Sequence, residues 1–276
     1  AGEVSPLEMI DAAAARIEEV EPALNALPTL CLDRARDKAK ALMADKSSDR
    51  NANFLHGLPI AVKDLNNVDG VRTTMGSPVF ADNISTQSDF MVQKLEENGA
   101  LVVAKSNTPE FGAGANTFNE VFGRTCNPWG LQKSPGGSSG GSAVALASGE
   151  VWLATGSDLG GSLRIPAAYC SIVGLRPTPG RVASGPGLLP FAALGVEGPM
   201  ARNVGDVALM LDAQSGPHIG DPLSIPAASP GAYQNAVDNP IKPKRMGYSR
   251  DFNLVPVDDE TANICAKAMQ IFTNIG

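Results

Sequence analysis

Short apolar runs that alternate with helix-forming stretches constrain the fold of this chain most strongly. The apolar runs cover residues 58–62, 101–104 and 151–155. The helical patterns between and after them cover residues 88–98, 139–148 and 203–214. Runs of four or five apolar residues have the length of buried strands, and strands that alternate with helices predict a layered α/β fold.

The N-terminal region predicts two helices. Ser5-Pro6-Leu7-Glu8 is typical of a capping box with proline at the first helical position, so we expect a helix from there to about Glu21. A second helix is expected over residues 32–44. Residues 5–20 are amphipathic and acidic, unlike the basic start and apolar stretch of a signal peptide, which favours a cytoplasmic location.

The C-terminal region is less regular. Residues 215–244 contain six prolines and little periodicity, which predicts an irregular excursion. Met246–Tyr248 predicts the start of a strand, and Asp258 or Asp259 is expected to cap a last helix that ends near Gly276. An α/β sheet would be expected to add another strand after such a helix, and none follows. Either the fold closes there or the chain is a fragment, and we favour the fragment.

Composition excludes several classes of protein. With 43% hydrophobic and 18% charged residues, the chain should be globular, and it has no apolar run long enough to span a membrane. It carries 22 basic and 29 acidic residues without a basic cluster, so direct binding of nucleic acid is not expected. The four cysteines lie far apart, which argues against a metal site or a disulfide scaffold; they are Cys31, Cys126, Cys170 and Cys265.

The stretch SPGGSSGGSAVALASG, residues 134–149, leaves several interpretations open. A flexible linker fits poorly, because the run leads directly into the helix-forming segment 143–147. A phosphate-binding loop would expose backbone N–H groups at a helix start, but the expected Gly-Lys-Ser/Thr is absent. Gly136 to Gly140 also match G-x-S-x-G, the nucleophile elbow of α/β-hydrolases, which would need His218 with Asp206 or Asp212.

A second serine-rich turn follows the apolar run 151–155. In Ser157-Asp158-Leu159-Gly160-Gly161-Ser162, two glycines before a serine let the backbone turn sharply and direct successive N–H groups toward one point. An oxyanion hole is built in this way. Upstream, Lys63 ends the apolar run 58–62, and considered alone it has the pattern of a lysine that reaches the surface.

Together these stretches resemble the amidase signature family. The resemblance covers nearly the whole chain and rests on the blocks HGLPIAVKD (56–64), GGSSGGSAVALASG (136–149), SDLGGSLRIPAA (157–168), GLRPTPGRV (174–182) and GPMARNVGDVALML (198–211). It implies an amidase-signature fold, with a mixed central sheet covered by helices on both faces and incomplete at the C-terminus. The resemblance also implies that residues 1–276 form a single domain.

The family's catalytic triad falls on Ser162 as nucleophile, Ser138 as bridging serine and Lys63 as base, with a cis peptide bond after Gly137. The resemblance places the oxyanion hole on the backbone N–H groups of Leu159, Gly160, Gly161 and Ser162. Lys63 must then be neutral, so burial and neighbouring groups must lower its pKa from about 10.4 to near neutrality.

Several neighbours are expected to support this site. Asp158 and Arg164 either orient the nucleophile turn or form a structural ion pair, and Ser139 is expected to bond near Lys63. Asp64 is expected to be solvated or capping.

Three side chains around the nucleophile depart from the residues common in the family: Ser157, Leu159 and Leu163. Because the oxyanion hole uses main-chain donors, these departures are expected to have little effect.

The resemblance implies an amidase that hydrolyses a carboxylic amide through an acyl-enzyme at Ser162. The expected partner is a small-molecule amide substrate, with no metal, no cofactor, no membrane and no direct nucleic-acid contact; a homodimer stays open. Two alternatives also remain. One is the glutaminase subunit of a tRNA-dependent amidotransferase, and the other is a catalytically inert fragment that binds an amide.

Overall fold

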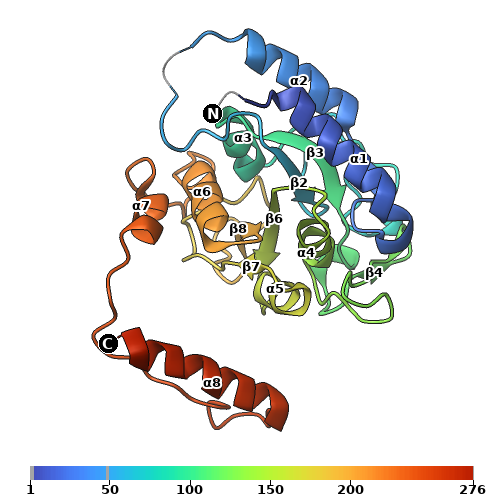
Figure 1. Cartoon of the computed structure of the whole chain (residues 1–276). Helices are drawn as coiled ribbons and strands as arrows, with labels where there is room; N and C mark the ends of the chain where they lie inside the picture. The colour runs from blue at the N-terminus through green and yellow to red at the C-terminus, as the bar shows by residue number, and fades with distance from the viewer. Residues whose placement is uncertain (1–2, 48–49, 276) are drawn as a thin grey trace. The chain divides into compact units, whose positions relative to one another are not determined.

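The structure is a computed structural model that describes residues 3–47 and 50–275. The chain divides into two compact units, Ala1–Asn235 and Ala236–Gly276, and each is described by itself. The first unit holds the sheet and the two serine-rich turns of the sequence, and the second holds one long helix (Figure 1).

A six-stranded mixed sheet forms the centre of the first unit, in the order β1-β3-β2-β6-β8-β7. Strand β2 pairs in parallel with β3 and β6, whereas the β1–β3, β6–β8 and β7–β8 pairs are antiparallel. The strands are β1 (Thr29–Leu30), β2 (Pro59–Lys63), β3 (Leu101–Ser106), β6 (Leu153–Asp158), β7 (Val173–Gly174) and β8 (Val196–Ala201). The predicted mixed sheet is therefore confirmed.

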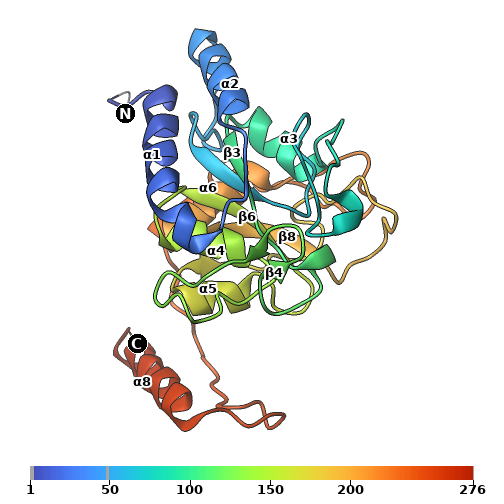
Figure 2. The ribbon, with the colours of Figure 1, turned by 90° about the vertical axis from the view of Figure 1, so that its right-hand side faces the viewer.

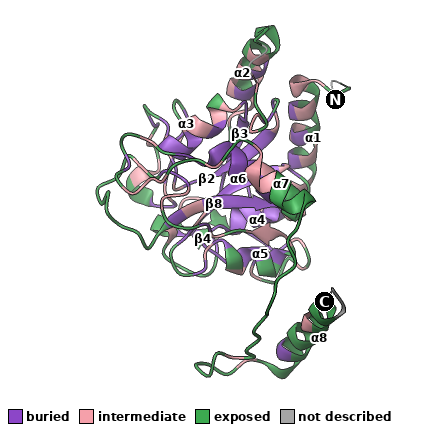
Figure 3. Cartoon of the chain, turned by 90° about the vertical axis from the view of Figure 1, so that its left-hand side faces the viewer, coloured by how far each residue is buried: buried purple, intermediate pink, exposed green. Residues whose placement is uncertain are grey.

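Helices cover both faces of this sheet (Figure 1 and Figure 2). One buried cluster joins one face to α1 (Pro6–Leu24), α2 (Leu32–Ala44), α4 (Gly140–Ala147) and α5 (Arg164–Cys170). The other joins the opposite face to α3 (Phe90–Glu97) and α6 (Val204–Gln214). Successive strand residues alternate between the clusters, as Ile60 and Ala61 do. Figure 3 shows the buried residues concentrated on the strands and the inner sides of the helices.

The remaining elements are short, apart from the last helix. They are the 3-10 helices η1 (Pro78–Phe80) and η2 (Glu110–Gly112), the antiparallel pair β4 (Phe118–Asn119) and β5 (Gly123–Arg124), and the helices α7 (Ala232–Asp238) and α8 (Asp259–Ile275).

Local signals placed the helix starts correctly. The Ser5 hydroxyl accepts the Glu8 N–H at 3.3 Å and the Glu8 carboxylate accepts the Ser5 N–H at 2.7 Å, so the capping box is present. Helix α1 continues beyond the expected end, to Leu24, where Asn25 in the left-handed conformation stops it. Asp258 accepts the Thr261 N–H at 3.0 Å and so caps α8.

Two expectations for the C-terminal region differ from the structure. Residues 246–248 form no strand, because a strand needs a hydrogen-bonded partner and none of the described strands pairs there. The stretch 215–244 contains α7, because the Asp212 carboxylate accepts the N–H groups of Tyr233 and Gln234 at 3.1 and 3.0 Å and thereby satisfies the start of that helix.

The four cysteines are free thiols, as the spacing predicts. Within residues 3–47 and 50–275, no helix combines the length and the apolar character needed to cross a membrane.

Candidate active site

Lys63 is the last residue of β2 and is completely buried. Its Nζ donates to the Ser138 hydroxyl at 2.7 Å and to the Ser157 hydroxyl at 2.9 Å. Its backbone N–H donates to Thr155 Oγ1 at 2.9 Å, which fixes the end of β2 against β6. The lysine that taken alone resembles a surface residue is therefore an interior residue held by two serines.

The environment of Lys63 lowers its pKa to about 7. Burial is the main cause, because the ammonium form loses its hydration, and the negative charges of Glu197 and Asp158 oppose it. The amine can therefore be neutral near physiological pH, which a base that accepts a proton from a serine requires.

Ser138 lies on a tightly packed turn before α4. The Gly137–Ser138 peptide bond is cis, as the family resemblance implies, and Gly136 has a φ of +75°. A Cβ at Gly137 would lie 2.8 Å from the backbone nitrogen of Asn116, so only glycine fits. Thr117 Oγ1 donates to the Gly136 carbonyl at 2.9 Å and accepts the Gly140 N–H at 3.1 Å. These contacts exclude a flexible linker.

Ser139 ties this turn to the strand and turn that carry the other candidates. Its hydroxyl lies 3.3 Å from both the carbonyl oxygen and the backbone nitrogen of Ser157. Its N–H donates to the Ser162 carbonyl at 3.3 Å. Ser139 therefore bonds near Lys63, to the backbone of Ser157, whose hydroxyl accepts the Lys63 amine.

The turn that carries Ser162, the candidate nucleophile, is organised around the buried carboxylate of Asp158. This carboxylate accepts the N–H groups of Gly161 at 2.7 Å and Leu163 at 3.2 Å, and the Arg164 guanidinium at 2.9 and 3.1 Å. Arg176 donates to the Asp158 carbonyl. Burial alone would raise the Asp158 pKa, but these bonds, led by that from Arg164, outweigh it and lower the pKa to about 2. Asp158 and Arg164 thus form an ion pair that also orients the turn.

The bond to Asp158 corrects one expectation for the oxyanion hole. The Gly161 N–H points to the Asp158 carboxylate, because that carboxylate reaches back across the turn, and it does not serve as a free donor. Leu159, Gly160 and Ser162 remain the candidate donors, and Leu159 and Gly160 are exposed. Ser162 is half-buried. Among the described residues, no hydrogen bond joins its hydroxyl to that of Ser138.

The alternative elbow with a histidine base is not assembled. The His218 ring stacks on Phe90 with centroids 3.6 Å apart, and its Nδ1 accepts the Gly220 N–H at 3.0 Å. Asp212 caps α7, and Asp206 accepts the Asn203 side chain at 2.7 Å. The Ser138 hydroxyl instead accepts a bond from a lysine, which contradicts the elbow interpretation.

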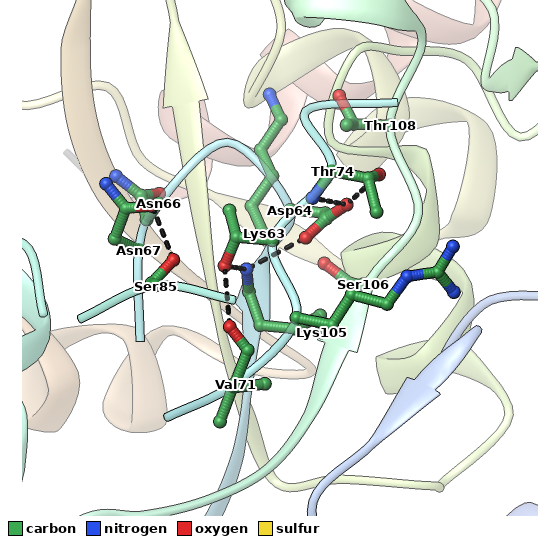
Figure 4. Close-up of polar contacts among 12 residues, drawn as sticks. Lys63, Asp64, Asn66, Asn67, Val71, Thr74, Ser85, Lys105, Ser106 and Thr108 are labelled. Carbon is green, nitrogen blue, oxygen red and sulfur yellow. Dashed lines mark hydrogen bonds and ion pairs between the residues drawn. The ribbon is translucent and has the colours of Figure 1, made fainter. Parts of the chain in front are cut away.

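A second buried lysine lies on the neighbouring strand, on the opposite face of the sheet. Lys105 pairs in register with Val62, and Lys63 pairs with Ser106, so the two lysine side chains point apart (Figure 4). Lys105 Nζ donates to Asp64 Oδ1 and Thr73 Oγ1, both at 2.8 Å. Asp64 is thus buried in an ion pair rather than solvated, because the Lys105 amine and the hydroxyl and N–H of Thr74 donate to its carboxylate.

Sequence reasoning missed Lys105, Ser157 and Glu197. Lys105 could have been found, because it follows the apolar run 101–104 just as Lys63 follows 58–62. Ser157 was expected to matter little, yet its hydroxyl is one of the two acceptors of the Lys63 amine. Glu197 carries no motif, and only the pairing of β8 with β6 brings it near Lys63.

Comparison with known proteins agrees with this geometry. The family model described as Amidase matches residues 8–276. An acylamidase from Rhodococcus erythropolis is 39% identical over 273 residues, which is 99% of this chain and 57% of the relative. A glutamyl-tRNA(Gln) amidotransferase subunit from Heliobacterium modesticaldum is 38% identical over 275 residues, which is 99% of this chain and 56% of the relative.

Solved structures show the same fold. A bacterial aryl acylamidase of the amidase signature family superposes with a TM-score of 0.91 at 31% identity, covering 99% of this chain and 57% of that one. The 6-aminohexanoate cyclic dimer hydrolase in complex with its substrate gives 0.85 at 31% identity, covering 100% and 57%. The chain belongs to the amidase signature family, and it spans little more than half the length of these relatives.

Proposed function

We propose that this chain carries the catalytic centre of an amidase that hydrolyses a carboxylic amide C–N bond through an acyl-enzyme at Ser162. The observation that carries the proposal is the buried Lys63 amine, bonded to the Ser138 hydroxyl at 2.7 Å and with its pKa lowered to about 7. A surface lysine stays protonated near pH 7 and could not serve as a base.

In the proposed reaction the Ser162 hydroxyl attacks the amide carbon, and its proton passes through Ser138 to Lys63. The oxygen of the tetrahedral intermediate accepts backbone N–H groups from the exposed turn, with Leu159 and Gly160 as first candidates. The proton then returns through Ser138 to the leaving nitrogen, and the C–N bond breaks. Water repeats the sequence on the ester, which releases the acid and restores Ser162.

Ser138→Ala tests the relay. The variant loses the hydroxyl that accepts the Lys63 bond, so we expect kcat/KM on a small aryl anilide to fall by about 10²–10³-fold, within the range of general acid–base catalysis. Because Ala fits wherever Ser fits, the melting temperature should stay close to that of the wild type. An unchanged rate would rule out Ser138 as the bridge.

The pH dependence tests the base. Protonation of Lys63 removes its ability to accept the Ser162 proton, so kcat/KM should fall as pH decreases through about 7 and rise to a plateau above it. A pH–rate profile on the same anilide checks this expectation. A plateau that persists below about pH 5 would contradict a lysine base.

The relatives favour one more specific candidate substrate. Because some of them are named as amidotransferase subunits, glutamine is the second substrate class to test. Release of glutamate and ammonia from glutamine, measured beside anilide cleavage by the same preparation, separates the two. Turnover of the anilide alone would favour a free-standing amidase, and turnover of glutamine alone would favour the glutaminase alternative.

A further inference from the structure

Glu197 lies on β8 directly opposite Ser157 of β6 in the antiparallel ladder. Side chains that are directly opposite in such a pair lie side by side on the same face of the sheet. The Ser157 hydroxyl accepts the Lys63 amine at 2.9 Å, so the Glu197 side chain lies next to an acceptor of the candidate base. The Oε2 oxygen of Glu197 is buried and has no hydrogen-bond partner.

Few charged groups act on this carboxyl. Lys63 approaches from β2 as the cation, and Asp89, which precedes α3, approaches as an anion. Asn66, in the loop after β2, lies near enough to lower the pKa of Glu197, and its amide donates to Asp89 at 3.2 Å. Asp158 acts on the same lysine from β6, but its own charge is satisfied by Arg164.

The other charged side chains of the surrounding elements have partners of their own. Helix α3 carries Lys94, Glu96 and Glu97, of which Lys94 pairs with Glu97 and Glu96 pairs with Arg34 and Lys38. Lys105 of β3 pairs with Asp64. The two aspartates of α6 bond to Asn203 and to the start of α7, and β7 and α4 carry no ionisable side chain. Arg176, which follows β7, is bonded to Asp158 and to the Leu194 carbonyl. Among the described residues, Lys63 is therefore the cation that acts on Glu197.

We propose that Glu197 is a positioning residue that sets how readily Lys63 holds its proton. The inference rests on the proposed role of Lys63 as base. An ionised Glu197 stabilises the ammonium form of Lys63, whereas a protonated Glu197 leaves the amine free. Glu197 therefore raises the pH at which Lys63 loses its proton toward neutral pH. Lys63 can then still return a proton to the leaving nitrogen.

The acid–base properties of the two groups agree with this role. Burial raises the pKa of Glu197 to about 7, and the positive charge of Lys63 opposes the rise. Burial lowers the pKa of Lys63 to about 7, and the negative charge of Glu197 opposes that fall. Two interacting groups with similar affinities titrate as a pair, so one proton is shared between them near neutral pH.

The test is a direct titration of Lys63, which needs no turnover. Protein labelled with ¹³C at the lysine Cε carbons is followed by NMR from about pH 5 to about pH 10, and Lys63→Met identifies the Lys63 signal. Glu197→Gln removes the charge and keeps the shape, so the Lys63 midpoint should move down by about one pH unit. Glu96→Gln is the matched control, because Glu96 is a carboxylate paired with Arg34 and Lys38. It should leave the midpoint unchanged.

A reciprocal measurement covers the case in which Glu197→Gln does not fold. Removing the cation by Lys63→Met should raise the midpoint of Glu197, followed through its labelled side-chain carboxyl carbon, by a similar amount. An unchanged midpoint in either experiment, measured on a folded variant, would overturn the proposal. Failure of the proposed function would be seen differently, as a Ser162 that neither reacts nor supports turnover while Lys63 and Glu197 still shift together.

Discussion

Lys63→Met is expected to lower kcat/KM on a small aryl anilide by about 10⁴-fold, the upper end of what a positioned general base contributes. Methionine fills a similar volume without the amine, so the Ser138 hydroxyl loses the group that takes its proton. The fold should survive, because the lysine is buried close to its neutral form and both of its hydrogen-bond acceptors are uncharged hydroxyls. Steady-state kinetics and a thermal melt on the same preparation measure both effects.

A variant that retained more than about a tenth of the wild-type rate would contradict the assignment of Lys63 as base. If the melting temperature fell sharply, the lower rate could come from unfolding rather than from loss of the base. The thermal melt is therefore recorded first. Arg16 offers a surface control, because Arg16→Met changes a cation outside the site and should leave the anilide rate unchanged.

Lys105→Met is expected to lower stability instead, with a loss of about 3–5 kcal/mol in the free energy of unfolding. Lys105 and Asp64 form an ion pair in which both side chains are buried, so removal of the lysine leaves the Asp64 charge without its cation. Urea unfolding near neutral pH measures the change. Lys105→Met combined with Asp64→Asn should recover much of the loss, because the pair is then removed as a unit.

If the single variant unfolded at the wild-type urea concentration, the pair would not be a stabilising element of the fold.

The two buried lysines differ in the groups that they contact. They occupy adjacent strands at nearly the same level of the sheet, yet the partner of one is a hydroxyl and the partner of the other is a carboxylate. Burial lowers the pKa of both amines, and at Lys105 the Asp64 carboxylate opposes that fall through a direct hydrogen bond.

Local signals in the sequence predicted most of the secondary structure. The Ser5 capping box and the apolar runs ending at Lys63 and at 101–104 depend on near neighbours, and they appear at the expected places. The strand expected at 246–248 failed because strand formation depends on a partner that local sequence does not reveal.

In the candidate site, too, some features depend on local sequence and others depend on how the strands pair. The serine-rich turns place Ser138 and Ser162 on motifs that the sequence displays. The bond from Lys63 to Ser157 joins residues 94 positions apart, and it depends, like the position of Glu197, on how β2, β6 and β8 pair. The bond from the Gly161 N–H to Asp158 depends on where one carboxylate points, and no spacing rule gives that direction.

The most direct test of Ser162 as the nucleophile is the intact mass of the protein after exposure to a fluorophosphonate, followed by peptide mapping of the modified residue. We expect a single adduct on Ser162, absent from Ser162→Ala and strongly slowed in Lys63→Met, because only an activated serine reacts rapidly with this probe. An adduct on Ser138, or no adduct on a folded protein, would contradict this assignment.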